Sequence, residues 1–164
     1  MGGSTGAGGS AGAGGISAGI PGTLKVTVTT KAAGGQYAPR NVGAIWIADS
    51  GNKFVKSLYV WAQRRRSYLS HWGSATSAAG LSANVVDAVT AATLSNHGVR
   101  TATWNGTNAS KVAVPDGAYK VCFELCDGGT VPYQCVDFNK SRTAQNLTPP
   151  DTANFTMRSI GYTP

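Results

Sequence analysis

Hydrophobic and polar side chains alternate with a period of two near the start of the chain. In residues 23–31, Leu24, Val26 and Val28 alternate with Lys or Thr, as expected of a β-strand that buries one face. Similar runs recur along the chain between clusters of Gly, Asn, Asp and Pro, which are typical of turns. The pattern predicts about seven strands, at residues 23–31, 42–48, 54–61, 98–104, 119–126, 133–138 and 153–162.

The region between the third and fourth predicted strands has a weaker pattern. Tyr68, Leu69 and Trp72 have a weakly helical spacing, but the residues that follow, GSATSAAGLSAN, are small and polar. We therefore expect residues 67–86 to form a long loop with one helical turn. With no convincing long helix, the strands predict an all-β fold in which two antiparallel sheets pack as a sandwich.

Two turns flank a short polar segment after the fourth predicted strand. The first is Asn105–Gly106, which follows a Trp, and the second is Pro115–Gly117, which precedes Tyr119. In the second turn Pro presets φ, Asp bonds to the local backbone, and Gly accepts a left-handed conformation. A Trp-Asx-Gly turn followed by Pro-Asp-Gly-x-Tyr resembles the immunoglobulin-like domains of bacterial exported proteins, including the flagellar hook-cap type. This resemblance implies an immunoglobulin-like sandwich.

The start of the chain has a different composition from the rest. Residues 1–19 are almost entirely Gly, Ser and Ala, a composition that is typical of a flexible tether because it cannot bury enough apolar surface to fold alone. We therefore divide the chain into a tether at residues 1–21 and one domain at residues 22–164. Bacterial lipoproteins often carry such a spacer after their lipid-modified Cys, so we expect that Met1 replaces that Cys. The membrane would then be reached only through a removed lipid anchor.

The three cysteines lie close together, at Cys122, Cys126 and Cys135. If residues 127–130 form the turn of a hairpin, Cys122 lies opposite Cys135. Cys122 and Cys126 would be about 13 Å apart in an extended strand, too far for a disulfide. A bond between Cys126 and Cys135 needs a wider loop, so we prefer the Cys122–Cys135 pair, with Cys126 free or an alternative partner. Disulfide use indicates export, and the spacing matches no zinc-ribbon pattern.

The chain carries a net charge of +7, and its basic residues are scattered apart from Arg64, Arg65 and Arg66. These arginines lie between aromatic residues such as Trp61, which is a combination that an anion-binding site would use. The alternative is a solvated strand end whose arginine stems lie against the rings. One tripeptide makes a small electrostatic footprint, so the sequence carries no strong nucleic-acid signal.

Three longer segments, taken in order, resemble one bacterial family. They are YAPRNVGAIWIADSGNKFVKSLYVWAQRRRSYLSHW, then VDAVTAAT, then HGVRTATWNGTNASKVAVPDGAYKV. Together they resemble the predicted periplasmic proteins grouped as domain of unknown function 2271, over roughly residues 24–162. The resemblance implies an exported protein, in the periplasm or at the bacterial cell surface, with an immunoglobulin-like sandwich and no established catalytic activity.

The segment DAVTAAT, residues 87–93, resembles a second pattern. Exported flavoproteins modified by periplasmic FMN transferases carry Asp-x-x-Ser/Thr-Gly-Ala-Ser/Thr, and the flavin phosphate is esterified to the last hydroxyl. By this resemblance Asp87, Thr90, Ala92 and Thr93 occupy matching positions, and Thr93 would carry the FMN. Ala91 departs from the pattern, because an Ala held at positive φ would be strained. The alternative is an ordinary connector in which Asp87 and the threonines bond to the backbone.

Ordinary hydrolytic chemistry is hard to assemble from this sequence. Ser70 and His71 are adjacent and would point apart in a strand. The pattern Gly-x-Ser-x-Gly occurs only in the low-complexity residues 1–19, so no nucleophile elbow between a strand and a helix is predicted. We expect His71 and His97 to be surface residues. Two classes of function therefore compete. One is a noncatalytic module of the cell envelope without a cofactor, whose partners are other envelope proteins or copies of itself; the other is an electron carrier with covalent FMN.

Overall fold

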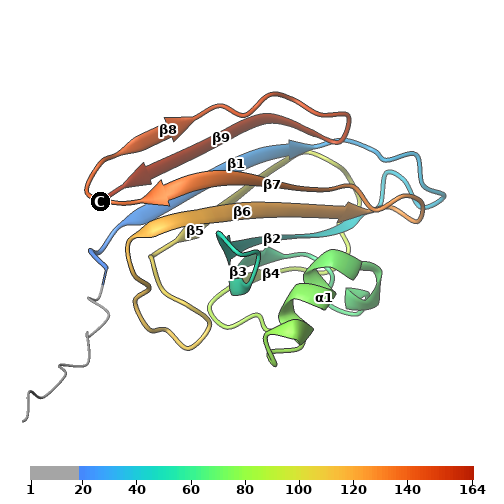
Figure 1. Cartoon of the computed structure of the whole chain (residues 1–164). Helices are drawn as coiled ribbons and strands as arrows, with labels where there is room; N and C mark the ends of the chain where they lie inside the picture. The colour runs from blue at the N-terminus through green and yellow to red at the C-terminus, as the bar shows by residue number, and fades with distance from the viewer. Residues whose placement is uncertain (1–18) are drawn as a thin grey trace, which may run out of the picture.

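The computed structural model describes residues 19–164, so most of the predicted tether at residues 1–21 lies outside the described residues. The described part folds into nine strands, one short 3-10 helix and one α-helix (Figure 1). In chain order the elements are β1 (Thr23–Thr30), β2 (Val42–Asp49), β3 (Phe54–Val60), η1 (Arg66–Tyr68), α1 (Ser70–Ala78), β4 (Val89–Thr90), β5 (Val99–Trp104), β6 (Gly117–Cys126), β7 (Tyr133–Lys140), β8 (Gln145–Leu147) and β9 (Phe155–Thr163).

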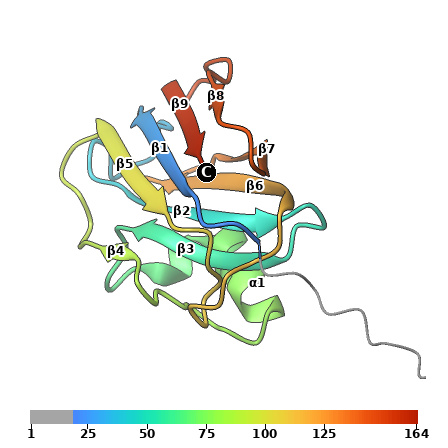
Figure 2. The same ribbon diagram turned by 90° about the vertical axis from the view of Figure 1, so that its left-hand side faces the viewer.

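The strands form two packed sheets, as the sequence predicts. One sheet has the order β5-β1-β9-β8 and the other the order β4-β3-β2-β6-β7. All pairings are antiparallel except that of β3 with the two-residue strand β4. Figure 2 shows the first sheet above the second, with α1 below the second sheet. The seven predicted strands are all present, and the short strands β4 and β8 are additional to them.

The second sheet is buried on both faces, which explains the long apolar run in β2. Ile45 and Ile47 belong to the core between the two sheets. Trp46, on the opposite face of β2, belongs to a second hydrophobic cluster together with Leu69 and Trp72 from the helical region. Because side chains alternate across a strand, β2 contributes to both cores at once.

The prediction of a long loop at residues 67–86 is wrong, because this region contains α1. The helix buries only Trp72 and Thr76, so the apolar periodicity that identifies most helices is weak here. Its N-terminus has no local side-chain cap. Instead the buried carboxylate of Glu124, on β6, accepts the N–H groups of His71 at 2.9 Å and Trp72 at 2.8 Å. A cap from a distant strand leaves no local sequence signal.

The Pro-Asp-Gly-x-Tyr motif forms the turn that leads into β6. The hydroxyl of Tyr119 donates a hydrogen bond of 2.8 Å to the carbonyl of Pro115, which is the arrangement of a tyrosine corner. In the preceding turn Gly106 has φ of 73°, a conformation that glycine adopts without strain. These two turns fix the entry of the chain into β6.

The predicted disulfide is present. Cys122 and Cys135 are register partners in the β6–β7 hairpin and are bonded to each other. Cys126 is a buried free cysteine at the end of β6. The disulfide therefore joins the two strands that lead to the hairpin end at Asp127.

Candidate functional site

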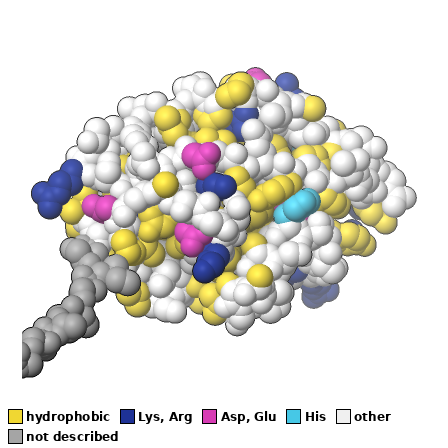
Figure 3. Space-filling model, in the orientation of Figure 1, with side chains coloured by type: hydrophobic (Ala, Val, Ile, Leu, Met, Phe, Trp, Pro, Cys, Tyr) yellow, Lys and Arg dark blue, Asp and Glu magenta, His cyan; other side chains and the backbone are white. Residues whose placement is uncertain are grey.

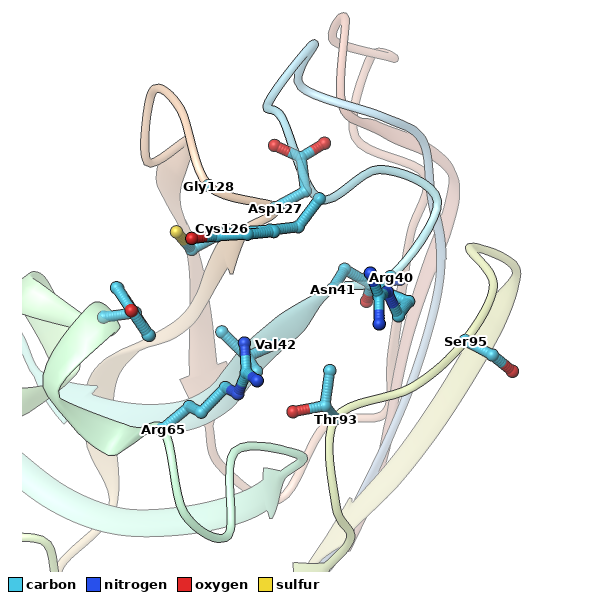
Figure 4. Close-up of a pocket in the computed structure, with 11 residues that line it drawn as sticks. Arg40, Asn41, Val42, Arg65, Thr93, Ser95, Cys126, Asp127 and Gly128 are labelled. Atoms are coloured by element: carbon cyan, nitrogen blue, oxygen red, sulfur yellow. The ribbon is translucent and has the colours of Figure 1, made fainter.

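A pocket of about 180 Å³ opens at the end of the sandwich where β6 ends and β2 begins (Figure 4). Its lining comes from four loops and strand ends that are far apart in the sequence. The lining residues are Tyr37, Arg40, Asn41, Val42, Arg65, Tyr68, Thr93, Ser95, Cys126, Asp127 and Gly128. The pocket lining therefore includes Thr93 from the DAVTAAT segment and Arg65 from the arginine run.

The backbone on both sides of Thr93 is fixed. Ala91 donates its N–H to the carbonyl of Val60 at 2.9 Å. Leu94 and Asn41 exchange two backbone hydrogen bonds, of 2.9 and 3.0 Å. Thr93 is half-buried between these anchors, and Figure 4 shows its hydroxyl turned toward the side chain of Arg65. No group within residues 19–164 forms a hydrogen bond to this hydroxyl, which faces the pocket.

The departure of Ala91 from the flavin-attachment pattern causes no backbone strain. Ala91 does not have positive φ. Within residues 19–164, the non-glycine residues that do are Asn52, Ala83, Asp87, Lys111 and Met157. Ala91 packs against the core between the sheets and bonds through its N–H to β3. The strain that a positive φ would impose on Ala at this position is therefore absent in the folded chain.

Two arginines face the pocket from different sides. Arg65 lies next to Tyr37, with its guanidinium carbon 6.0 Å from the ring centroid, which is within the range of a cation–π contact. Arg40 lies across the pocket from Arg65, with Thr93 between them (Figure 4). Sequence reasoning did not identify Arg40, because only the fold brings the connection between β1 and β2 to this site.

The predicted run of three arginines does not act as one group. Arg65 lines the pocket with Thr93, whereas Arg66 lines a separate, open depression beside α1. Arg64 is exposed and lines neither. Trp61 is covered by Arg100, at 5.7 Å from its ring centroid, and not by a member of the run. The three arginines therefore do not share one pocket.

The one carboxylate in the lining is directed away from the arginines. Asp127 accepts the N–H groups of Ala33 at 2.8 Å and Gly35 at 3.0 Å, and Figure 4 shows its carboxylate pointing out of the pocket. Its side chain is fully buried. Asp127 therefore fixes the connection between β1 and β2, and leaves Arg40 and Arg65 as the charges that face the opening.

His97 lies close to Asp127 and is not the surface residue that the sequence suggests. Its side chain is 13% exposed, and its Nε2 lies 3.9 Å from the Oδ2 of Asp127. Neither ring nitrogen has a hydrogen-bond partner in the described part of the chain. Burial lowers the pKa of His97, and the charge of Asp127 opposes this shift. His71, in contrast, is 44% exposed, as expected.

The other end of the DAVTAAT segment has a structural role. Asp87 does not bond to the backbone, as the connector alternative supposed, but pairs with Lys111 at 3.1 Å and Lys56 at 3.5 Å. The hydrogen bond from Lys111 is the largest cause of the lowered pKa of Asp87. Thr90 and Ala92 are exposed between the two ends. The fold therefore brings Thr93 to the pocket and leaves the other three matching residues outside it.

Ser70 and His71 both contact the carboxylate of Glu124. The hydroxyl of Ser70 lies 3.5 Å and the Nδ1 of His71 lies 3.2 Å from the same oxygen, Oε1. That oxygen also accepts the backbone N–H of His71, so Glu124 caps the start of α1.

Within residues 19–164 there is no cluster of three His, Cys, Asp or Glu side chains that could hold a metal ion. None of the helices in this range is long and apolar enough to span a membrane.

Comparison with known proteins identifies the family of the chain. The family described as predicted periplasmic proteins, domain of unknown function 2271, matches residues 23–147. No curated protein and no solved structure gives a significant match. The matched residues run from β1 to β8 and include both Thr93 and the arginines of the pocket. The family description agrees with the export that the disulfide indicates and gives the location as the periplasm. The chain therefore belongs to the family of predicted periplasmic proteins grouped as domain of unknown function 2271.

Proposed function

We propose that this periplasmic module is an electron carrier that holds FMN through a phosphoester on Thr93. The observation that carries the proposal is the position of the Thr93 hydroxyl, which has no hydrogen-bond partner in the described chain and faces a pocket with two arginines. This position links two independent facts, because the sequence around Thr93 resembles a flavin-attachment segment and the fold supplies cations for a phosphate.

The residues of the pocket fit the phosphate end of FMN. A phosphate on Thr93 would lie between Arg40 and Arg65, and guanidinium groups form charge-assisted hydrogen bonds with phosphate oxygens. The pocket volume of about 180 Å³ is below the roughly 300–1,000 Å³ of most small-molecule sites. The ring system would therefore extend past the mouth, where Tyr37 and Tyr68 are 37% and 45% exposed. A site this small benefits from a covalent bond, because it cannot enclose the whole cofactor.

The attachment step is a phosphoryl transfer from FAD that a periplasmic FMN transferase would catalyse. The Thr93 oxygen forms a bond to the phosphorus of the FMN half of FAD, the pyrophosphate bond breaks, and AMP leaves with the bonding electron pair. The hydroxyl proton goes to a base of the transferase. Bound FMN supplies redox chemistry in one- or two-electron steps. Arg40 and Arg65 then hold the phosphate, and the fixed backbone of Ala91 and Leu94 sets the position of the attachment point.

Intact mass of the protein from its own periplasmic fraction tests the proposal. We expect the added mass of one FMN, located on the peptide that contains Thr93. Thr93→Ala should carry no flavin, whereas Thr93→Ser should keep it, since Ser supplies the same oxygen. Thr90→Ala is the matched control, because Thr90 is an exposed threonine of the same segment. Native protein without added mass would refute the proposal.

A noncatalytic assembly role without a cofactor is the second candidate, and the unpaired edge of β5 favours it. β5 is the end strand of its sheet, and its first residue, Val99, is 59% exposed. An exposed edge strand can pair with another chain. Light scattering over a range of concentrations tests this role, because assembly through β5 should give particles larger than a monomer, and Val99→Lys should reduce them.

A further inference from the structure

We infer that the Cys122–Cys135 disulfide is a redox-active site, which accepts two electrons from a dithiol of an exported partner protein by thiol–disulfide exchange. The inference does not depend on the flavin proposed at Thr93. Three observations carry it: the disulfide lies at a free sheet edge, its two cysteines differ in exposure, and a tyrosine hydroxyl contacts both sulfur atoms.

The disulfide links two strands that backbone hydrogen bonds already hold together. β6 and β7 pair at eight successive positions, and Cys122–Cys135 is one of these pairs. The two cysteines are 13 residues apart, and a bridge that closes a short loop constrains the unfolded chain less than one that closes a long loop. The backbone ladder does not involve sulfur. It therefore remains available to hold the hairpin when the disulfide is reduced.

The two ends of the disulfide differ in access. Cys122 is 1% exposed, whereas Cys135 is only half-buried. Cys122 lies on β6, between β2 and β7, and Cys135 lies on β7, which is the end strand of this sheet in the described chain. A thiolate attacks a disulfide from the side away from the leaving sulfur. The direction from β6 across β7 leads to the free edge, so an incoming thiolate attacks Cys135 and Cys122 is the leaving group.

The hydroxyl of Tyr133 is placed to assist this exchange. It lies 2.9 Å from the Sγ of Cys135 and 3.9 Å from the Sγ of Cys122. The hydroxyl is the donor, because a disulfide sulfur carries no proton. Burial raises the pKa of Tyr133, and the charge of Glu124 adds to this shift, so the hydroxyl keeps its proton at neutral pH. A hydrogen bond to a thiolate lowers the pKa of that thiol, and a leaving thiol with a lower pKa departs faster.

Two stacked rings hold Tyr133 in this position. The ring of Trp46 lies 5.7 Å from that of Tyr133, and the ring of His71 lies 4.3 Å from it, both nearly parallel to it. Tyr133 and His71 are 42% and 44% exposed. In Figure 3, a histidine borders hydrophobic side chains on the face where Figure 1 shows β6, β7 and α1. A partner protein that reaches Cys135 therefore meets an aromatic surface beside it, a residue type that is enriched in protein interfaces.

The exchange is balanced with a dithiol as the reductant. The first thiolate of the partner forms a bond to the Sγ of Cys135, the disulfide bond breaks, and Cys122 leaves with the bonding electron pair. The second thiolate of the partner attacks its own sulfur in this mixed disulfide, and Cys135 leaves. The protons that the two partner thiols lose end on Cys122 and Cys135. The partner is oxidised to a disulfide and the chain is reduced to two thiols.

The second thiol has to come from the partner. Cys126, the other cysteine of the chain, is 5% exposed and lies four residues from Cys122 on the same strand. This spacing places it about 13 Å along β6 from the Cys122–Cys135 pair, which is too far for it to attack the mixed disulfide. A dithiol is therefore the class of reductant that completes the reaction.

Reduction of the folded protein by dithiothreitol tests the inference. Acid quenching, alkylation and intact mass measure the rate at which the Cys122 and Cys135 thiols appear. We expect a rate that is proportional to dithiothreitol concentration and does not change with urea below the unfolding transition. A rate that rises with urea in parallel with global unfolding would overturn the inference, because the disulfide would then react only in the unfolded chain.

Tyr133→Phe keeps the stacked ring and removes the hydroxyl. This variant should slow the reduction about threefold or more, because the leaving thiolate loses its donor. Tyr68→Phe is the matched control, since Tyr68 is a similarly exposed tyrosine without a contact to the disulfide, and it should react at the native rate. Equal rates for Tyr133→Phe and the native protein would contradict the role of the hydroxyl.

Single-cysteine variants test which sulfur is attacked. Cys122→Ser leaves the thiol of Cys135, and Cys135→Ser leaves the thiol of Cys122, while Cys126 is present in both. With 5,5′-dithiobis(2-nitrobenzoic acid), Cys122→Ser should react about tenfold or more faster than Cys135→Ser. Equal rates or the reverse order would overturn the assignment of Cys135. Thr93→Ala should be reduced by dithiothreitol at the native rate, so the exchange and flavin attachment can fail separately.

Discussion

The two ends of the DAVTAAT segment differ in how their polar groups are used. At one end Asp87 is held by Lys56 and Lys111. At the other end the Thr93 hydroxyl has no partner within the described chain, and faces Arg40 and Arg65 across a pocket. The first arrangement satisfies its charges internally, whereas the second leaves a hydroxyl and two guanidinium groups without an ion-pair or hydrogen-bond partner between them. A satisfied group contributes to stability, and an unsatisfied one can bind or react.

Two residues that both match the attachment pattern therefore lie in different surroundings. Asp87 matches the attachment pattern but lies in a different small depression, with Lys56 and Trp104. Thr93 matches the pattern and also lines a pocket with Arg40 and Arg65. The sequence of the segment alone does not show that Thr93 lies near arginines. The comparison predicts that removing the lysine partners of Asp87 alters stability, while changing Thr93 itself alters function.

The largest expected effect on stability is that of Lys56→Met. Lys56 is 4% exposed and donates to Thr107 at 2.8 Å as well as pairing with Asp87. Its removal should lower the free energy of unfolding by about 1–2 kcal/mol, since Asp87 keeps Lys111 and contact with water. Urea denaturation measures the change. Lys111→Met is the control and should cost less than about 0.5 kcal/mol, because Lys111 is 64% exposed. If the two variants lose equal free energy of unfolding, the burial of Lys56 does not make its contribution larger than that of Lys111.

A smaller effect is expected from His97 at the pocket end. Burial lowers the pKa of His97 below its ordinary value of 6.5, so the folded protein binds fewer protons than the unfolded chain. Stability should therefore be complete above about pH 6.5 and fall as the pH decreases below it. His97→Gln should remove part of this fall, as measured by urea midpoints at pH 7.5 and 5.5. His71→Gln should preserve it; an unchanged fall in His97→Gln would exclude His97 as the source.

Asp87→Asn should have the smallest effect on stability. Asn tolerates the positive φ of 58° at this position, and Asp87 is largely exposed. The lowered pKa of Asp87 means that its ion pairs stabilise the fold above about pH 3.8 and that this contribution is lost as the pH falls through the folded pKa. The difference in melting temperature between the variant and the native protein should thus vanish at low pH. A difference that persists there would not come from the charge of Asp87.

Much of the fold was predictable from local patterns. Alternation in residues 23–31 identified β1, and the register of a short-turned hairpin placed Cys122 opposite Cys135. These predictions succeeded because strand period and turn chemistry are local properties. Helix α1 was missed, since its cap is Glu124 on a remote strand and only Trp72 and Thr76 on it are buried.

The candidate site was predictable only in part. The sequence pointed to Thr93 and to the run at Arg64–Arg66, but it could not show that one member of that run, Arg65, faces the hydroxyl. No sequence motif marked Arg40 as a site residue. It reaches the pocket because Asp127 fixes the preceding loop through Ala33 and Gly35.

The sequence by itself predicted the seven longer strands, the disulfide and the family, and pointed to Thr93 as a candidate site residue. Each of these predictions depends on residues close together in the chain. Only the tertiary structure decided which arginines share a pocket with Thr93, which histidine is partly buried, and which carboxylates already have partners. These properties arise from contacts between β-connections far apart in sequence, and the free energy of a polar group depends on the partners that those contacts supply.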